Sequence, residues 1–279
     1  MVRCKVDKMN IIDTHIHYLP EAIPGEKIIR NMDECGISRS IVLSVPDHPR
    51  YGKMRLTGTN TVVEDLCRKY PDRLIPALYA EPRNVMEVQT QIRRFHDRGG
   101  RVLKMWPGHG WAPDDPMIYP VWEVINELKM IVILHMGMLG VRTGQLPVEI
   151  CRSTGFNAKY GQPVLLDAPG RCFPDIQFVI AHTAYPWTLE ALEMVFMFKN
   201  IWMDFSCGLG YEAWNLIEKL RPGRMQWERF LFGSDTAGTA RDFVSRWSEI
   251  AQHEYFAPHA EDFFHKNAEN LLRKAGLEI

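Results

Sequence analysis

The chain has 279 residues, of which 46% are hydrophobic and 24% charged, and its formal net charge is -1. This composition is typical of a globular protein with a large core, and the balanced charge argues against nucleic acid as a partner. We expect no membrane partner, because no apolar run could span a bilayer and the N-terminus lacks the apolar region of a signal peptide. Six scattered cysteines without a C-x-x-C pair indicate reduced thiols and a cytoplasmic location.

Short apolar segments alternate with helical patterns along the whole chain. In chain order, the predicted strands are 11–17, 39–45, 74–80, 101–105, 130–134, 176–181, 201–205 and 230–232. Helical spacing predicts helices over 26–35, 61–70, 84–98, 119–128, 162–171, 188–199 and 214–220, with two or three more between 240 and the end. The longest connection, Met136–Lys159, contains several glycines that would permit it to act as a lid.

This order of elements predicts an α/β fold, because strands that alternate with helices form parallel sheets. Eight strand-helix units in about 250 residues are typical of a (β/α)8 barrel (TIM barrel). We therefore expect one domain over residues 1–279, with extra C-terminal helices. A doubly wound open sheet fits less well, because no G-x-G-x-x-G follows the first strand.

Metal-binding or proton-transferring side chains stand at the ends of four predicted strands. His15 and His17 end the first strand and are expected to face the same side, because alternate strand residues share a face. His135, His182 and Asp235 end the fifth, sixth and eighth strands. Each histidine alone reads equally well as an ordinary hydrogen-bonded residue. Together, at strand ends that meet in one pocket of a barrel, they indicate a hydrolytic metal site.

The sequence resembles the amidohydrolase superfamily, and within it the group that includes aminocarboxymuconate-semialdehyde decarboxylase. The resemblance runs nearly end to end and rests on the following motifs: Ile11–His17, Ile133–Gly137, Phe173–His182, Leu231–Asp235 and Asn267–Leu272. It implies that His15, His17, His135 and Asp235 hold one divalent metal ion, Zn²⁺ first and Mn²⁺ as the alternative. It also implies that His182 is a catalytic acid/base or an occasional ligand of the metal, and that the protein is a homodimer.

The sequence departs from that group next to two of these residues. Members often have Gly-Gly after the sixth-strand histidine and Tyr-Pro after the eighth-strand aspartate. Here Thr183-Ala184 and Thr236-Ala237 take those places. Lys104 stands on the fourth strand, where some branches carboxylate a lysine to bridge two metals. We interpret it as a charged pocket residue of a one-metal site.

The expected function is a metal-dependent hydrolase that cleaves a small amide, ester or lactone, with Asp235 accepting the proton of the attacking water. The alternative is non-oxidative decarboxylation of an aromatic or dienoic acid in the same site. A catalytically silent metal-binding barrel is the third hypothesis. The expected partner is a small, planar, anionic substrate, and the expected contacts come from loops after the strands: Lys104, Trp106, His109, Arg142 and Tyr185.

Overall fold

The computed structural model describes residues 10–46, 57–138, 147–218 and 222–278. Eight parallel strands form one sheet in sequence order, so that each strand pairs with the next. They are β1 (Ile11–His17), β2 (Ile37–Leu43), β3 (Leu74–Tyr79), β4 (Val102–Met105), β5 (Ile131–Leu134), β6 (Gln177–Ile180), β7 (Ile201–Asp204) and β8 (Phe230–Leu231). All eight predicted strands are confirmed, and the fold is a (β/α)8 barrel.

Backbone hydrogen bonds between β1 and the segment from β8 onward close the barrel. The Thr14 N–H donates to the Phe232 carbonyl at 3.0 Å, and the His17 N–H donates to the Thr236 carbonyl at 2.8 Å. Between them, the Asp235 N–H donates to the His15 carbonyl at 2.7 Å. The last strand end is therefore held directly beside the first.

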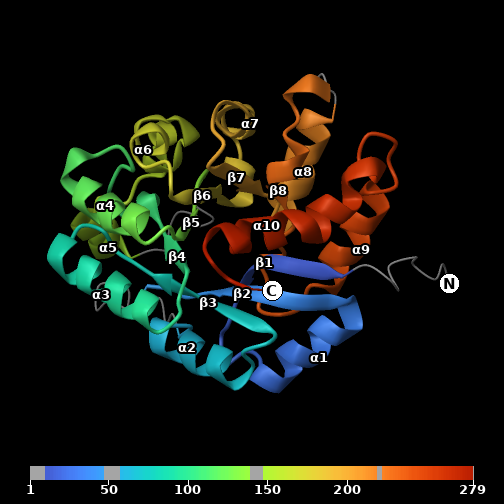
Figure 1. The fold of residues 1–279 in the computed structure, drawn as a ribbon, viewed down its shortest axis with the longest axis horizontal. Helices are drawn as coiled ribbons and strands as arrows, with labels where there is room; N and C mark the ends of the chain where they lie inside the picture. The colour runs from blue at the N-terminus through green and yellow to red at the C-terminus, as the bar shows by residue number, and fades with distance from the viewer. Residues whose placement is uncertain (1–9, 47–56, 139–146, 219–221, 279) are drawn as a thin grey trace.

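Helices surround the barrel, and Figure 1 shows them as a ring around the strands. The α-helices are α1 (Gly25–Cys35), α2 (Asn60–Lys69), α3 (Val85–Asp97), α4 (Tyr119–Glu127), α5 (Val148–Thr154), α6 (Asp167–Cys172), α7 (Thr188–Met197), α8 (Cys207–Ile217), α9 (Arg241–Ile250) and α10 (Asn267–Lys274). Helix α1 ends as predicted at Gly36, which adopts a left-handed conformation with φ of 69°.

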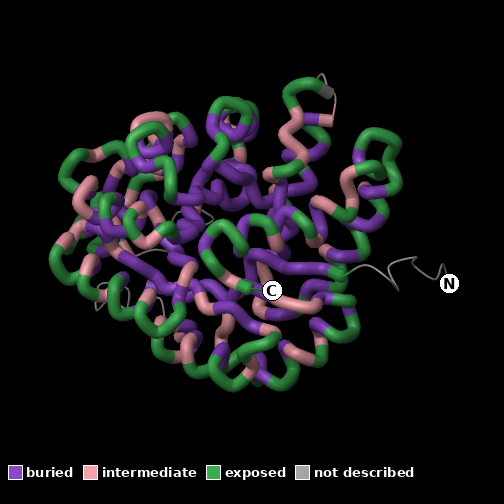
Figure 2. The backbone as a smooth tube through the Cα atoms, in the orientation of Figure 1, coloured by how far each residue is buried: buried purple, intermediate pink, exposed green. Residues whose placement is uncertain are grey.

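Two buried layers follow from the alternation of side chains along each strand. One lies between the strands and the helices and includes Ile16 and Met203. The other fills the barrel and includes Ile12 and Ile133, together with Leu271 of α10. Helix α10 thus lies across one mouth of the barrel, in the centre of Figure 1, and Figure 2 shows the strands buried beneath it. The strands end at the opposite mouth.

Three stretches differ from the predicted helices. Helix α5 lies inside the long connection Met136–Lys159 and was not predicted. The predicted helix over 162–171 is a 3-10 turn, Pro163–Leu166, followed by the short α6. Helix α8 begins at Cys207, well before 214, because Gly210 lets its first turn lie against Phe205: a Cβ on Gly210 would stand 2.2 Å from the Phe205 carbonyl oxygen. Within the described ranges, no helix has the length and apolar character needed to cross a membrane.

Candidate active site

The two histidines of β1 face the open mouth of the barrel. Ile16, between them, packs into the layer under the helices, so His15 and His17 point to the opposite side. His15 is fully buried, whereas the His17 side chain is 25% exposed. This pair therefore runs from the buried interior of the barrel toward solvent, with His17 the more exposed.

Asp235 lies beside both histidines because of the closing hydrogen bonds between β1 and the β8 end. Its Oδ1 stands 3.4 Å from His15 Nε2 and 3.3 Å from His17 Nε2. The residue adopts a left-handed backbone conformation with φ of 53°, which is uncommon outside glycine and asparagine. The carboxylate is thus turned from the strand end toward the imidazoles.

A left-handed turn after β6 aims His182 into the same cluster. His182, Thr183 and Ala184 have φ values of 58°, 53° and 49°, without a glycine among them. His182 Nδ1 lies 3.8 Å from Asp235 Oδ2, and its Nε2 lies 3.2 Å from His135 Nδ1. The structure therefore brings all five predicted strand-end residues together: His15, His17, His135, His182 and Asp235.

The donor set fits a divalent metal ion. His17 Nδ1 lies 3.1 Å from the Leu43 carbonyl oxygen, which can only accept, so Nδ1 carries the proton and Nε2 offers its lone pair. The Nε2 atoms of His15 and His135 are buried and have no hydrogen-bond partner among the described residues. Potential ligand atoms of His15, His182 and Asp235 lie within 4.8 Å of one another. The Nε2 lone pairs of His15 and His17 face the Asp235 carboxylate, and a cation between them would bind all three groups.

Burial and mutual contact set the charge of the cluster. Burial lowers the pKa of His182 to about 3, and it also lowers the pKa of His15 and His135, so these rings are neutral at neutral pH. Burial alone would raise the pKa of Asp235, but contacts with the imidazoles of His182, His15 and His17 hold it well below its usual range. The site thus presents neutral imidazoles and an ionised carboxylate, the protonation states in which both bind metals.

Lys104 and Trp106 lie at the same mouth of the barrel. Lys104 is 5% exposed, and its Nζ has no hydrogen-bond partner in the described part of the chain. Burial lowers its pKa to about 8, with Asp204 and Asp235 opposing the shift. The Trp106 ring lies 4.5 Å from the His135 ring, and its buried Nε1 is also unpaired in the described ranges. These two donors suit an anionic group of a substrate.

The remaining predicted substrate contacts are placed less directly. His109 is fully buried behind Trp106, with ring centroids 4.2 Å apart, and its Nδ1 lies 2.9 Å from the Tyr79 hydroxyl. Tyr185 is half-buried, and its carbonyl accepts a hydrogen bond from the Met138 N–H at 2.8 Å. Arg142 and part of the predicted lid lie outside the described residues. The substrate-binding roles of all three stay predictions.

Sequence reasoning missed Asp204 and Ser206 at the end of β7. Asp204 Oδ2 lies 2.9 Å from His15 Nδ1, and Ser206 Oγ lies 2.8 Å from His182 Nδ1. Burial alone would raise the pKa of Asp204, but contact with His15 lowers it below its usual range. Its position near the end of the predicted strand 201–205 was the signal that could have identified it.

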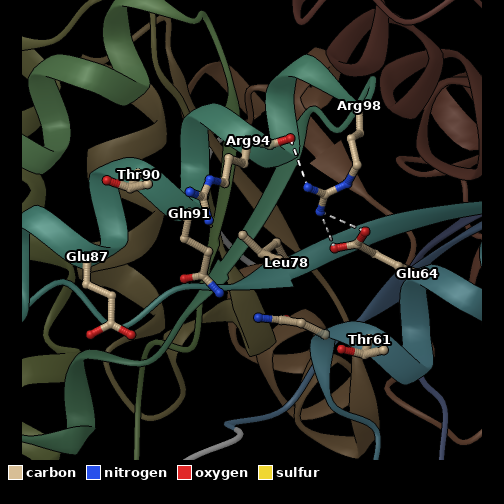
Figure 3. Close-up of a pocket in the computed structure, with 9 residues that line it drawn as sticks. Thr61, Glu64, Leu78, Glu87, Thr90, Gln91, Arg94 and Arg98 are labelled. Atoms are coloured by element: carbon tan, nitrogen blue, oxygen red, sulfur yellow. Dashed lines mark hydrogen bonds and ion pairs between the residues drawn. The ribbon is translucent and has the colours of Figure 1, made fainter.

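A separate hollow lies outside the barrel between α2 and α3 (Figure 3). There Arg98 donates hydrogen bonds to Glu64 at 2.8 Å and to the Arg94 carbonyl at 3.1 Å. None of the five clustered residues lines this hollow. It is therefore distinct from the strand-end cluster, and the chemistry of the site does not depend on it.

Comparison with known proteins gives one family and several solved structures. The family model described as amidohydrolase matches residues 12–274. An uncharacterized TIM-barrel protein from Bordetella bronchiseptica superposes with a TM-score of 0.72 at 20% identity, over 96% of this chain and 100% of that chain. A 2,6-dihydroxybenzoate decarboxylase from Rhizobium gives 0.64 at 16% identity, over 95% and 99% of the two chains.

A 5-carboxyvanillate decarboxylase from Novosphingobium aromaticivorans, complexed with manganese and 4-hydroxy-3-methoxy-5-nitrobenzoic acid, gives a TM-score of 0.62 at 17% identity, over 95% of this chain and 96% of that one. The search of curated proteins gives no match. At these identities the solved structures support the barrel fold, whereas the family model covers nearly the whole chain.

Proposed function

Because the chain belongs to the amidohydrolase family, we propose that this enzyme is a metal-dependent hydrolase that cleaves a small amide, ester or lactone to a carboxylate. His15, His17, His135 and Asp235 would hold one divalent ion, Zn²⁺ or Mn²⁺. This is supported by the Nε2 atoms of His15 and His17, which lie 3.4 Å and 3.3 Å from Asp235 Oδ1, and by His135, which joins the cluster through His182. When bound, such an ion supplies Lewis acidity, which lowers the pKa of water and polarises a carbonyl group.

The ionised carboxylate of Asp235 is the observation that favours hydrolysis over decarboxylation. Its carboxylate is ionised at neutral pH and 26% exposed, so it can accept a proton at the open side of the cluster. Water adds to the acyl carbon, and one of its protons passes to Asp235. The bond from that carbon to the leaving nitrogen or oxygen then breaks, and Asp235 returns the proton to the leaving amine or alkoxide. Neutral His182 lies beside Asp235 during this transfer, with its Nδ1 3.8 Å from Asp235 Oδ2. Lys104 and Trp106 hold an anionic group of the substrate.

Decarboxylation of a planar carboxylic acid is the second candidate. It is favoured by the buried Lys104 Nζ and Trp106 Nε1, which have no partner in the described residues and suit an aromatic carboxylate, and by fold relatives named as decarboxylases. In this reaction the bond to the carboxylate carbon breaks, carbon dioxide leaves, and a proton from Asp235 or His182 bonds to the ring carbon. It ranks second because both residues are deprotonated at neutral pH in this structure.

Metal content and product analysis on the same samples test the proposal. We expect about one divalent ion per chain in the wild-type protein and less in His15→Ala and Asp235→Ala. A panel of lactones, amides and aromatic carboxylates then separates the reactions. Acid release without carbon dioxide supports hydrolysis, and carbon dioxide release selects the second candidate. A wild-type protein that takes up neither Zn²⁺ nor Mn²⁺ would overturn both.

Two other expectations remain predictions, the homodimer and the cytoplasmic location. Light scattering on the eluting protein after size-exclusion chromatography tests the homodimer, which predicts twice the mass of one chain.

A further inference from the structure

Asp204 is a fully buried carboxylate that accepts four hydrogen bonds from the pocket wall. Its Oδ2 accepts one, from His15 Nδ1 at 2.9 Å. Its Oδ1 accepts three: from the His182 N–H at 2.9 Å, from the Ser206 N–H at 3.0 Å and from the Ser206 hydroxyl. A buried charge needs such donors, and all four of these donors are groups of the protein itself.

These contacts impose one direction on a chain of hydrogen bonds. A carboxylate only accepts, so His15 Nδ1 carries its proton and the Ser206 hydroxyl points its hydrogen at Asp204. The Ser206 oxygen is then left to accept from His182 Nδ1–H, at 2.8 Å. His182 Nε2 therefore has a lone pair, which accepts from His135 Nδ1–H at 3.2 Å. His135 Nε2 is left with its lone pair free.

We propose that Asp204 is a positioning residue that sets the tautomers of His15, His182 and His135 for metal binding. It acts on His15 directly, on His182 through Ser206, and on His135 through both. Among the described residues, the Nε2 atoms that this leaves unpaired are those of His15 and His135, and they are the ones offered to the metal. His182 lies within ligand distance of His15 and Asp235, but with Nδ1–H donated to Ser206 and Nε2 accepting from His135 it has no free lone pair for the ion.

The inference rests on the proposed metal centre and not on the choice between hydrolysis and decarboxylation. A purely structural role for Asp204 is the competing explanation, because its contacts with the N–H groups of His182 and Ser206 also join the ends of β6 and β7. A structural role requires only that an oxygen remain at the Oδ1 position. The positioning role requires an acceptor at the Oδ2 position as well.

The variant Asp204→Asn separates these roles. Three donors face the Oδ1 position, so the amide oxygen of asparagine takes that place and its NH₂ group faces His15 Nδ1. An NH₂ group donates, so His15 must accept at Nδ1 and carry its proton on Nε2. That tautomer cannot bind a metal through Nε2. Ser206→Ala instead interrupts the chain toward His182 and His135 and leaves the contact between Asp204 and His15 in place.

The experiment is ¹⁵N NMR of metal-free protein labelled at histidine, which distinguishes protonated from unprotonated ring nitrogens. In the wild type we expect Nδ1–H on His15, His182 and His135. In Asp204→Asn we expect Nε2–H on His15 and weakening of Zn²⁺ binding by about 10- to 100-fold, the usual range for lost partners of metal ligands. In Ser206→Ala we expect His15 unchanged and the tautomers of His182 and His135 altered.

Asp13→Asn is the matched control. Asp13 is equally buried beside His15, but its Oδ1 accepts from the backbone N–H groups of His15 and Ser234, at 3.1 Å and 3.0 Å. Its replacement is expected to leave all three tautomers as in the wild type. Nε2–H on His15 in the wild type, or unchanged tautomers and Zn²⁺ affinity in Asp204→Asn, would overturn the inference. Expected tautomers in a wild type without turnover would count against the proposed reaction alone.

Discussion

His109 couples the stability of the protein to pH at the scale of a single side chain. Burial, with nearby Arg83 adding to it, lowers the pKa of His109 to about 3, from a usual value near 6.5. Between pH 6.5 and 3 the unfolded chain therefore binds a proton at His109 that the native protein does not. The free energy of unfolding is expected to fall as the pH decreases, by at most about 1.4 kcal/mol per pH unit from this residue.

The variant His109→Gln removes this contribution and leaves a side chain that can still hydrogen-bond. Urea unfolding at pH 5 to 6.5 is expected to show a shallower pH dependence for the variant than for the wild type. Between pH 7.5 and 8.5 neither state titrates at His109, so the two proteins should change in parallel. If the wild type and the variant showed the same pH dependence at pH 5 to 6.5 as well, His109 would take up its proton without unfolding.

Most of the site was predictable at the residue scale, because barrel topology brings strand ends together whatever their separation in sequence. His15, His17, His135, His182 and Asp235 were identified in this way. Asp204 was not, because its place near a strand end was available in the sequence but its partner in the site was not. Its contact with His15 depends on side-chain directions across 189 positions of sequence, which composition and spacing do not contain.

At the scale of elements, the end of α4 carries strain that can be removed. Lys129 follows the helix in a left-handed conformation with φ of 51°, and the Met130 N–H bonds back to the Ile125 carbonyl, as at ends where glycine is usual. That conformation costs an L-residue roughly 1–2 kcal/mol, and the extra freedom of unfolded glycine offsets roughly 0.5–1 kcal/mol. Lys129→Gly should therefore raise the free energy of unfolding by about 0.5–1 kcal/mol in urea denaturation.

Glu123→Gly provides the control within the same helix. Glu123 is exposed in the interior of α4, where glycine lowers stability by about 1 kcal/mol. The two substitutions are thus expected to change the free energy of unfolding in opposite directions. A loss of stability in both would show that the left-handed position at Lys129 carries no strain.

Gly137, after β5, lies against the backbone of two other segments: Gly161, later in the same connection, and Tyr185, after β6. The Gly137 N–H donates to the Gly161 carbonyl at 2.8 Å, and a Cβ on Gly137 would stand 2.6 Å from the Tyr185 carbonyl oxygen. Gly137→Ala is therefore expected to lower the free energy of unfolding by about 3 kcal/mol or more. The alanine would be strained at this positive φ, and the backbone near Tyr185 would also have to move away from its Cβ. Chemical denaturation measures the loss.

Gly99→Ala isolates the conformational part of that effect. Gly99 also has a positive φ, 92°, but a Cβ there would meet nothing within 4 Å. The Gly99→Ala variant should lose only about 1–2 kcal/mol of its free energy of unfolding, the cost of the left-handed conformation. If Gly137→Ala and Gly99→Ala lowered the free energy of unfolding equally, the backbone around Gly137 would accommodate the Cβ at no cost.

Element order was more predictable than element boundaries. All eight strands were identifiable because each is a short apolar run between helical patterns. Helix α8 was predicted too short, since Gly208 and Gly210 read as a loop, whereas the close approach of Gly210 to Phe205 makes glycine the residue that fits. The helix α5 gives a weak sequence signal because it is short and largely exposed, so periodicity could not identify it.

At the scale of the whole molecule, metal binding should stabilise the fold. A ligand that binds only the native state adds about 2.7 kcal/mol at 100 times its Kd. Thermal unfolding with excess Zn²⁺ is therefore expected at a higher temperature than unfolding with a chelator. His15→Ala and Asp235→Ala should lose this difference. Arg94→Ala, in the outer hollow of Figure 3, should retain it. A shift that persists in His15→Ala would place the stabilising ion elsewhere.

The seam between β1 and the end of β8 has a consequence for how the molecule comes into being. The Thr14 hydroxyl donates to the Phe232 carbonyl, 218 positions later in the chain, and the same seam sets Asp235 beside His15. During synthesis His15 and His17 leave the ribosome long before Asp235. A chain that stops short of Asp235 therefore lacks the carboxylate of the proposed metal site, so tight metal uptake is expected only after synthesis has passed the end of β8.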